Sequence, residues 1–193
     1  MPSTLSVIKF LLLYGAYIWV IPPFRQYKQR LFYYFLFMAF GDPIQRLITH
    51  NNFTMPSNYY TTFSYILLAA ILWNKKSPKL NYLLIAGGIV IFILSSIVFK
   101  FTYDTDKLFF LGLQIIILFL FLKKFITDYT SYSKINVFQL VLVFFQLTVV
   151  SKIGLFILGT SNAIAFYIIT STIGIAFGLY FSIYREDKTK FPA

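Results

Sequence analysis

Long apolar runs separated by short polar connections dominate this chain. Seven runs approach the about 20 apolar residues that a helix needs to cross a membrane. They cover residues 5–21, 31–49, 59–73, 81–99, 108–126, 137–158 and 163–184. The pattern predicts an all-α fold, a polytopic integral membrane bundle of seven helices. Six is the alternative, if the first run or the Asp-bearing second run does not cross.

The connections between the runs differ in charge. Basic residues follow the first, third, fifth and seventh runs: Arg25, Lys28, Arg30, Lys75, Lys76, Lys79, Lys123, Lys124, Lys134, Arg185, Lys188 and Lys190. The alternate connections carry few charges or balance lysines with aspartates. Because positively charged connections stay in the cytoplasm, we expect the N-terminus outside and the C-terminus inside, in a plasma or inner membrane.

The connections are also short. None exceeds roughly a dozen residues, so we expect a single transmembrane domain over residues 1–193 and no soluble domain. We expect the first run to be retained as an anchor, because no small-residue cleavage site follows it before Pro22.

The composition excludes several classes of functional site. Hydrophobic residues make up 59% of the chain, aromatic residues 21% and charged residues 12%, unlike a soluble domain. With no cysteine and one histidine, the chain offers no disulfide scaffold, thiol nucleophile, zinc finger or multi-histidine metal site, and we expect no cofactor. The net charge of +11 lies mainly in the connections. That placement indicates contact with anionic membrane lipids and argues against nucleic acid.

Four ionisable residues interrupt the apolar runs: Lys9, Asp42, Arg46 and Lys152. Charges inside a membrane are costly, which makes them candidates for function. Asp42 and Arg46 are four residues apart on one helical face, with Gln45 beside them. Gly41 and Pro43 predict a kink at the same place. The pair either neutralises itself and steadies the kink or forms a ligand or proton site; the sequence leaves both open.

Depth relates these charges to one another. In the expected orientation Lys9, Arg46 and Lys152 fall in the outer leaflet, with Asp42 one turn deeper and Gln114 at a similar level. If they face the interior, they line an outward-facing pocket of net positive charge, suited to a carboxylate, a phosphate or a lipid head group. The alternative is that the basic side chains extend to the membrane surface instead.

Two further patterns concern helix packing. Gln139 and Gln146 share one face of the sixth run, and Lys152 lies about 120° from Gln146, so this helix is expected at the centre. The glutamines either form interhelical hydrogen bonds or serve the pocket. The small residues Gly87-Gly88 and the pair Gly174 and Gly178 predict close internal packing, with a homodimer seam as the alternative.

These residues favour a non-enzymatic, receptor-like or accessory membrane protein that holds a small anionic or amphiphilic ligand. Asp42 and Arg46 would form a gate and Lys152 the anion contact, and the remaining candidates are Lys9, Gln45, Gln114 and Gln146. Any signal would pass to a membrane protein partner or a second copy.

Two other functions remain. A small secondary transporter would use the same pocket, with Asp42 as its coupling carboxylate. The inner halves of the runs are mainly Phe, Leu and Ile, with Gln139 as the exception, which favours binding over transport. An intramembrane lipid-modifying enzyme is least favoured, because so few catalytic groups are present.

Overall fold

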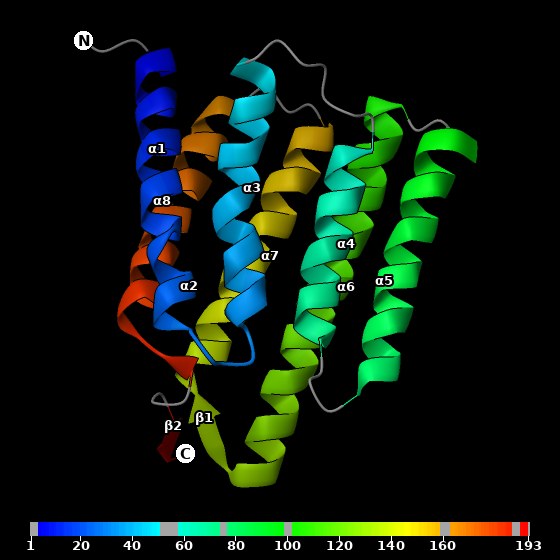
Figure 1. The fold of residues 1–193 in the computed structure, drawn as a ribbon. Helices are drawn as coiled ribbons and strands as arrows, with labels where there is room; N and C mark the ends of the chain where they lie inside the picture. The colour runs from blue at the N-terminus through cyan, green and yellow to red at the C-terminus, as the bar shows by residue number, and fades with distance from the viewer. Residues whose placement is uncertain are drawn as a thin grey trace.

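A computed structural model describes residues 4–50, 58–73, 77–98, 102–158, 163–186 and 190–192. Helices stand side by side as a bundle (Figure 1). They are α1 (Thr4–Trp19), α2 (Ile21–Arg25), α3 (Phe32–His50), α4 (Tyr59–Leu72), α5 (Pro78–Ile93), the π-helix η1 (Leu94–Val98), α6 (Tyr103–Tyr132), α7 (Val137–Leu158) and α8 (Ala163–Ile183). The helical fold expected from the apolar runs is confirmed, because each of the seven runs contains a helix.

One feature departs from an all-α chain. The strand β1 (Lys134–Asn136) pairs antiparallel with β2 (Lys190–Pro192), and Ile135 lies opposite Phe191. This pair joins the connection between α6 and α7 to a segment near the C-terminus. Alternating hydrophobicity over three residues is too short to predict a strand from sequence.

Three helical segments are long and apolar enough to cross a membrane: Pro78–Ile97, Asp104–Ser131 and Val137–Leu158. Shorter apolar helices cover Phe32–Gly41, Tyr59–Leu72 and Ile168–Ile183. The beginning of α1 and the strand β2 lie at opposite ends of the bundle (Figure 1). Below, "upper" denotes the end at which α1 begins and "lower" the end at which β2 lies.

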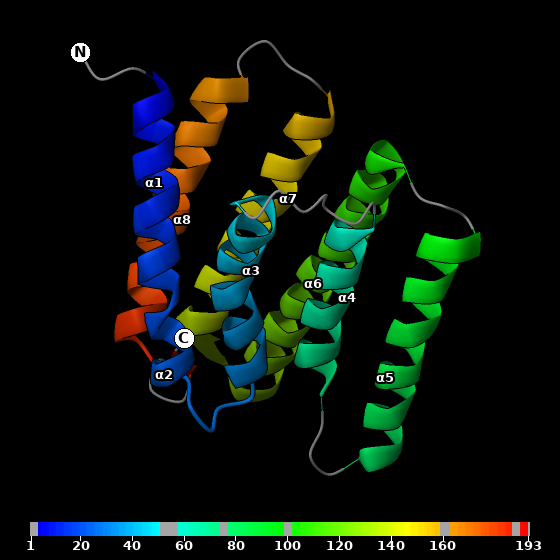
Figure 2. The ribbon, with the colours of Figure 1, turned by 45° about the horizontal axis from the view of Figure 1, so that its top comes forward.

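The helices pack around α7, which contacts both α6 and α8. On one side α8 packs against α1 and α2; on the other, α6 packs against α4. α3 closes the bundle by contacting α1 and α4. α5 lies at one edge, against α4 (Figure 2). The central place expected for the sixth run is therefore confirmed.

Aromatic rings fill the lower half of the core. Phe35, Phe138 and Phe181 are fully buried, with ring centroids of Phe35 and Phe138 5.0 and 5.2 Å from that of Phe181. Trp19 joins them, its ring centroid 4.8 Å from that of Phe145. Buried aromatic side chains remove a large apolar area from the surroundings, and these rings tie α1, α3, α7 and α8 together.

α6 extends beyond the apolar run that predicts it. Its 30 residues span about 45 Å at 1.5 Å per residue, more than the about 30 Å hydrocarbon core of a membrane. At its start the Thr102 hydroxyl accepts a hydrogen bond from the Thr105 amide, and Asp104 and Asp106 occupy its first turn. At its end Ser133 adopts the left-handed conformation, with φ 47°.

Glycines permit two close helix contacts. A Cβ atom on Gly178 would lie 2.8 Å from Cγ2 of Ile18, so this glycine lets α8 approach α1. Gly87 and Gly88 similarly admit the ring of Tyr65 from α4, whose hydroxyl donates to the Leu84 carbonyl at 2.9 Å. The predicted internal packing is confirmed at these glycines. A Cβ atom on Gly174, in contrast, would meet no other atom within 4 Å.

Gly174 and Gly178 should therefore respond differently to substitution. We expect Gly178→Ala to destabilise the protein by about 1–3 kcal/mol, because α1 and α8 must separate. Gly174→Ala should be neutral or slightly stabilising, because alanine restricts the unfolded chain. Thermal unfolding of the purified variants in detergent measures both. Equal loss of stability in the two variants would contradict the packing described.

Candidate functional site

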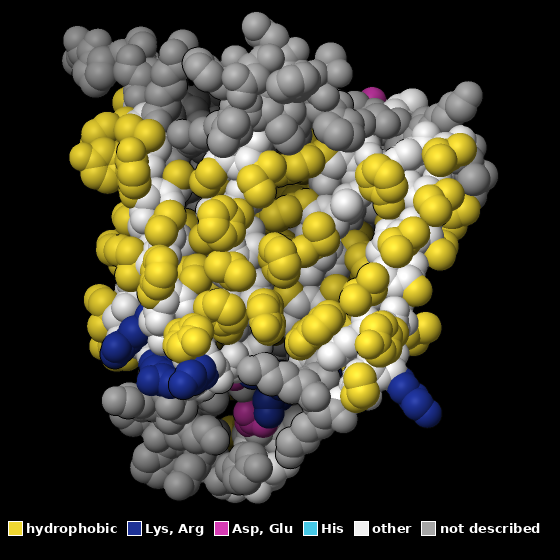
Figure 3. Space-filling view, viewed as in Figure 1, with side chains coloured by type: hydrophobic (Ala, Val, Ile, Leu, Met, Phe, Trp, Pro, Cys, Tyr) yellow, Lys and Arg dark blue, Asp and Glu magenta, His cyan; other side chains and the backbone are white. Residues whose placement is uncertain are grey.

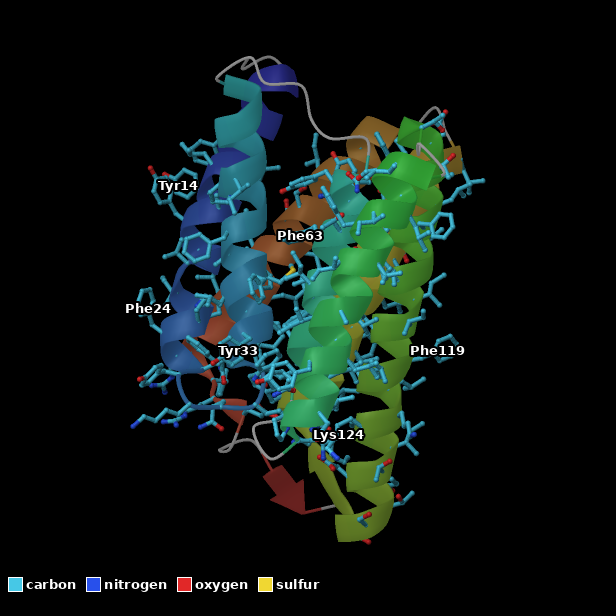
Figure 4. The ribbon with its side chains drawn as sticks, turned by 45° about the vertical axis from the view of Figure 1, so that its right-hand side comes forward. Tyr14, Phe24, Tyr33, Phe63, Phe119 and Lys124 are labelled. Carbon is cyan, nitrogen blue, oxygen red and sulfur yellow. The ribbon has the colours of Figure 1, made fainter. Side chains whose placement is uncertain are left out.

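A cavity of about 440 Å³ occupies the upper half of the bundle. Its lining comes from six helices, α1, α3, α4, α6, α7 and α8. Its walls are mostly apolar and include the rings of Trp19, Phe63, Phe145 and Phe166. Phe63 lies between α3 and α4, whereas the exposed rings of Phe24 and Phe119 point away from the bundle (Figure 4). We call this space the upper cavity.

Two lysines bring positive charge to the upper cavity. The ammonium group of Lys152, on α7, donates to the Ser171 hydroxyl of α8 at 3.3 Å. Lys107, on α6, lies 4.8 Å above the Phe156 ring and 3.2 Å from the carboxylate of Asp104. The side chain of Lys107 is 16% exposed and that of Asp104 is 90% exposed. None of the described lining residues is acidic, so the cavity wall carries net positive charge.

A chain of buried hydrogen bonds forms the lower boundary of this cavity. Gln146 Nε2 donates to Gln114 Oε1 at 2.6 Å, and Gln114 Nε2 donates to the Ser64 hydroxyl at 2.7 Å. The Tyr34 hydroxyl donates to Gln146 Oε1 at 3.2 Å. The two glutamines are at most 3% exposed. The chain links α3, α7, α6 and α4, which confirms that Gln146 bonds between helices.

A carboxylate holds the upper ends of α4 and α6 together. Asp106 is 1% exposed and accepts hydrogen bonds from the backbone amides of Tyr60 at 3.0 Å and Thr61 at 2.9 Å. These amides belong to the first turn of α4, where a negative charge also favours the helix dipole. Asp106 thereby fixes Tyr60 and the adjacent Lys107 in the cavity wall.

The structure brings some of the predicted residues together. Lys152, Gln114 and Gln146 all line the upper cavity, although Lys152 and Gln146 point in different directions from α7. The cavity reaches both sides of this central helix. Lys152 is partly buried, and its ammonium group bonds to α8.

Other predicted residues cannot be placed at side-chain level. Lys9 belongs to α1, and Asp42, Gln45 and Arg46 belong to α3, but their side chains lie outside the described part of the structure. The expected pairing of Asp42 with Arg46 therefore stays a prediction. The neighbouring Gly41 lines the cavity, and its carbonyl accepts from the Tyr59 hydroxyl at 3.1 Å.

Sequence reasoning missed several residues of this site. Lys107 and Asp106 lie in a segment that the charge pattern assigns to a connection, whereas the structure places both in α6. The signal was the cap at Thr102 with Asp104 and Asp106 after it, which is typical of a helix start. Trp19 also lines the cavity.

A second cavity, of about 210 Å³, lies at the lower end. It is lined by residues of α4, α6 and α7, by Arg30 and Leu31 before α3, and by Glu186 after α8. Lys124, labelled in Figure 4, belongs to its wall. We call this space the lower cavity. Gln146 borders the upper cavity and Gln139 the lower one, both on the same face of α7.

Neither a family model, nor a curated protein, nor a solved structure matches this chain. Within the described residues, no group of three His, Cys, Asp or Glu side chains could hold a metal ion. The upper cavity presents two ammonium groups near one end, hydroxyls along the wall and aromatic surfaces between them.

Replacing Gln146 tests the buried hydrogen-bond chain. Gln146→Leu leaves the Tyr34 hydroxyl and Gln114 Oε1 without their partner, and we expect a loss of about 1–3 kcal/mol in unfolding free energy. Thr148→Val is the matched control, because its hydroxyl bonds within its own helix, to the Phe144 carbonyl at 2.9 Å. Denaturant titration in detergent should show little change for this control. A Gln146→Leu variant as stable as the wild type would argue against the chain.

Proposed function

We propose that the protein is a multi-pass membrane protein with seven spans, its upper end outside and its lower end in the cytoplasm. Hydrophobic side chains cover the middle of the bundle surface, and lysine and arginine side chains gather along its lower edge (Figure 3). This distribution supports the proposed orientation, since basic residues favour the cytoplasmic surface. The beginning of α1 and the strand β2 lie at opposite ends of the bundle, which supports an odd number of spans between them.

We further propose that the upper cavity binds a small amphiphilic anion, in a receptor-like or accessory role. The observation that carries the proposal is the pairing of Lys107 and Lys152 at the upper end of a cavity with aromatic walls. A carboxylate or phosphate would lie between the two ammonium groups. Its apolar part would extend along Phe63 and Phe145 toward the glutamines.

The cavity dimensions support this arrangement. Lys152 lies six residues from Gln146 on α7, or about 9 Å along the helix. Lys107 lies seven residues from Gln114 on α6, or about 10 Å. Both cations thus lie well above the amide chain, and the space between is apolar. A volume of about 440 Å³ falls within the range of small-molecule sites.

Tryptophan fluorescence can test this binding directly, because Trp19 lines the cavity. The chain has two tryptophans, so Trp73→Phe leaves Trp19 as the sole reporter. Dodecanoate carrying a terminal bromine should quench Trp19 saturably. Lys152→Met and Lys107→Met should each weaken binding about tenfold, the loss expected for one charge-assisted hydrogen bond. Gly174→Leu, which fills the cavity, should abolish saturable quenching.

Three controls separate binding from partition into detergent. The uncharged bromododecanol should quench equally in the wild type and both lysine variants. Lys79→Met, at an exposed position at the start of α5, should leave dodecanoate binding unchanged. Gly112→Leu adds the same bulk at an exposed position of α6 away from the cavity. Quenching that is non-saturable, or unaffected by Lys152→Met and Lys107→Met, would exclude the proposed site.

One observation favours transport as a second candidate. The lower half of the bundle contains the lower cavity, whose mostly apolar wall includes the buried amide of Gln139. The two cavities lie at opposite ends of one face of α7, separated by buried side chains that include Tyr34 and Leu142. A transporter would open this layer alternately to each side.

Liposomes distinguish the two candidates. If the protein transports the anion, proteoliposomes loaded with radiolabelled dodecyl phosphate should release it faster than protein-free liposomes loaded in the same way. Asp42→Asn should remove any dependence of this release on a pH gradient. We expect no acceleration from a binding protein. Proteoliposomes that contain the Lys152→Met variant are the control. If the anion crosses through the upper cavity, loss of its binding site must slow its release.

A further inference from the structure

The lower cavity has a basic rim. Among its described lining residues, Arg30 and Lys123 are exposed and Lys124 is partly buried. Lys124 also pairs with Asp128, one turn further along α6. Three cationic side chains from two parts of the chain thus surround one opening, and the Thr127 hydroxyl lies beside them.

The inner wall of this cavity contains two buried oxygens that lack hydrogen-bond partners among the described residues. They are Gln139 Oε1 and Glu186 Oε2. Gln139 is 5% exposed, and its amide nitrogen is already used, because it donates to Asp128 Oδ2 at 2.9 Å. A buried acceptor without a donor destabilises the protein. The geometry therefore calls for a hydrogen-bond donor in this cavity.

The charge of Glu186 depends on its surroundings. Burial raises the pKa of this carboxyl above its ordinary value. Arg30, the Leu31 backbone amide and Lys124 act in the opposite direction. Asp128 adds to the rise. The carboxyl is thus less readily ionised than a solvated one, so the three basic side chains outnumber the Asp128 carboxylate that pairs with Lys124.

We propose that the lower cavity binds the head group of an anionic phospholipid that carries hydroxyls, such as phosphatidylglycerol. Arg30, Lys123 and Lys124 would contact the phosphate, and the head-group hydroxyls would donate to Gln139 Oε1 and Glu186 Oε2. This site is separate from the upper cavity and goes beyond the function proposed for it.

Two features favour a lipid over a soluble phosphate ester. The remaining wall is apolar and comes from Leu31, Ile71, Leu72 and Leu120, which suits an acyl chain. Lysine and arginine side chains gather along the lower edge of the hydrophobic surface (Figure 3), which is the level expected for phospholipid head groups in the proposed orientation. Basic pockets between membrane helices on the cytoplasmic side are suited to anionic head groups.

Lipid binding to the purified full chain in detergent tests the proposal, measured by native mass spectrometry. Phosphatidylglycerol should bind about tenfold more tightly than phosphatidic acid, which has the phosphate but no head-group hydroxyl. Phosphatidylcholine should not compete. Lys123→Gln and Arg30→Gln should each weaken phosphatidylglycerol binding about fivefold. Lys79→Gln, an exposed lysine outside the cavity, should leave it unchanged.

The hydroxyl contacts have their own variants. Gln139→Leu should remove the preference for phosphatidylglycerol over phosphatidic acid while retaining both lipids. If loss of the hydrogen bond to Asp128 prevents Gln139→Leu from folding, Glu186→Met is used as a second variant. Lys152→Met, in the upper cavity, should leave phosphatidylglycerol binding unchanged. Failure of the upper site is therefore distinguishable from failure of the lower one.

Three results would overturn the proposal. The first is equal binding of phosphatidylglycerol and phosphatidic acid by the wild type. The second is equal weakening by Lys79→Gln and Lys123→Gln, which would indicate general attraction to the basic surface. The third result concerns the source of the phosphate. If glycerol 3-phosphate displaces phosphatidylglycerol at matched concentrations, the acyl chain contributes nothing to binding, which contradicts the lipid assignment.

Discussion

Two amide side chains in the centre of an apolar bundle must find hydrogen-bond partners, and this requirement organises the helices around them. Gln114 and Gln146 bond to each other, and the remaining groups reach Ser64 and Tyr34. Four helices are thereby held at one level. An unpaired amide would be costly in a low-dielectric interior, so this arrangement restricts how α3, α4, α6 and α7 can rotate or slide against one another.

The two cavities follow from this arrangement. Just below the amides, rings such as Phe35 and Phe138 pack closely together, whereas above them small side chains, including Gly15 and Gly174, leave space unfilled. Asp106 keeps the upper ends of α4 and α6 fixed around that space. The bundle therefore combines a hydrogen-bonded central layer with a mostly apolar cavity toward each end.

The helices were predictable from hydropathy because each apolar run exceeds the length of a turn or strand. α7, for example, matches its run from 137 to 158. Side-chain partnerships were not predictable. Periodicity shows that Gln146 and Lys152 point in different directions, but it cannot show that a cavity reaches both sides of α7. Hydropathy also placed Asp106 in a connection, because a buried carboxylate bonded to backbone amides looks the same in sequence as a solvated one.

α5 packs against one neighbouring helix, α4, and this limits how many of its positions are constrained during evolution. Its inward contacts use few positions, including Gly87 and Gly88 beside Tyr65 and, in η1, Ser95 bonded to Asn58 at 2.8 Å. Most of its other side chains, such as Tyr82 and Leu83, are exposed. Lipid tails accept any apolar side chain about equally, so those positions can exchange freely during evolution. Selection on this helix should therefore act on a single narrow face, while the rest varies within apolar residue types.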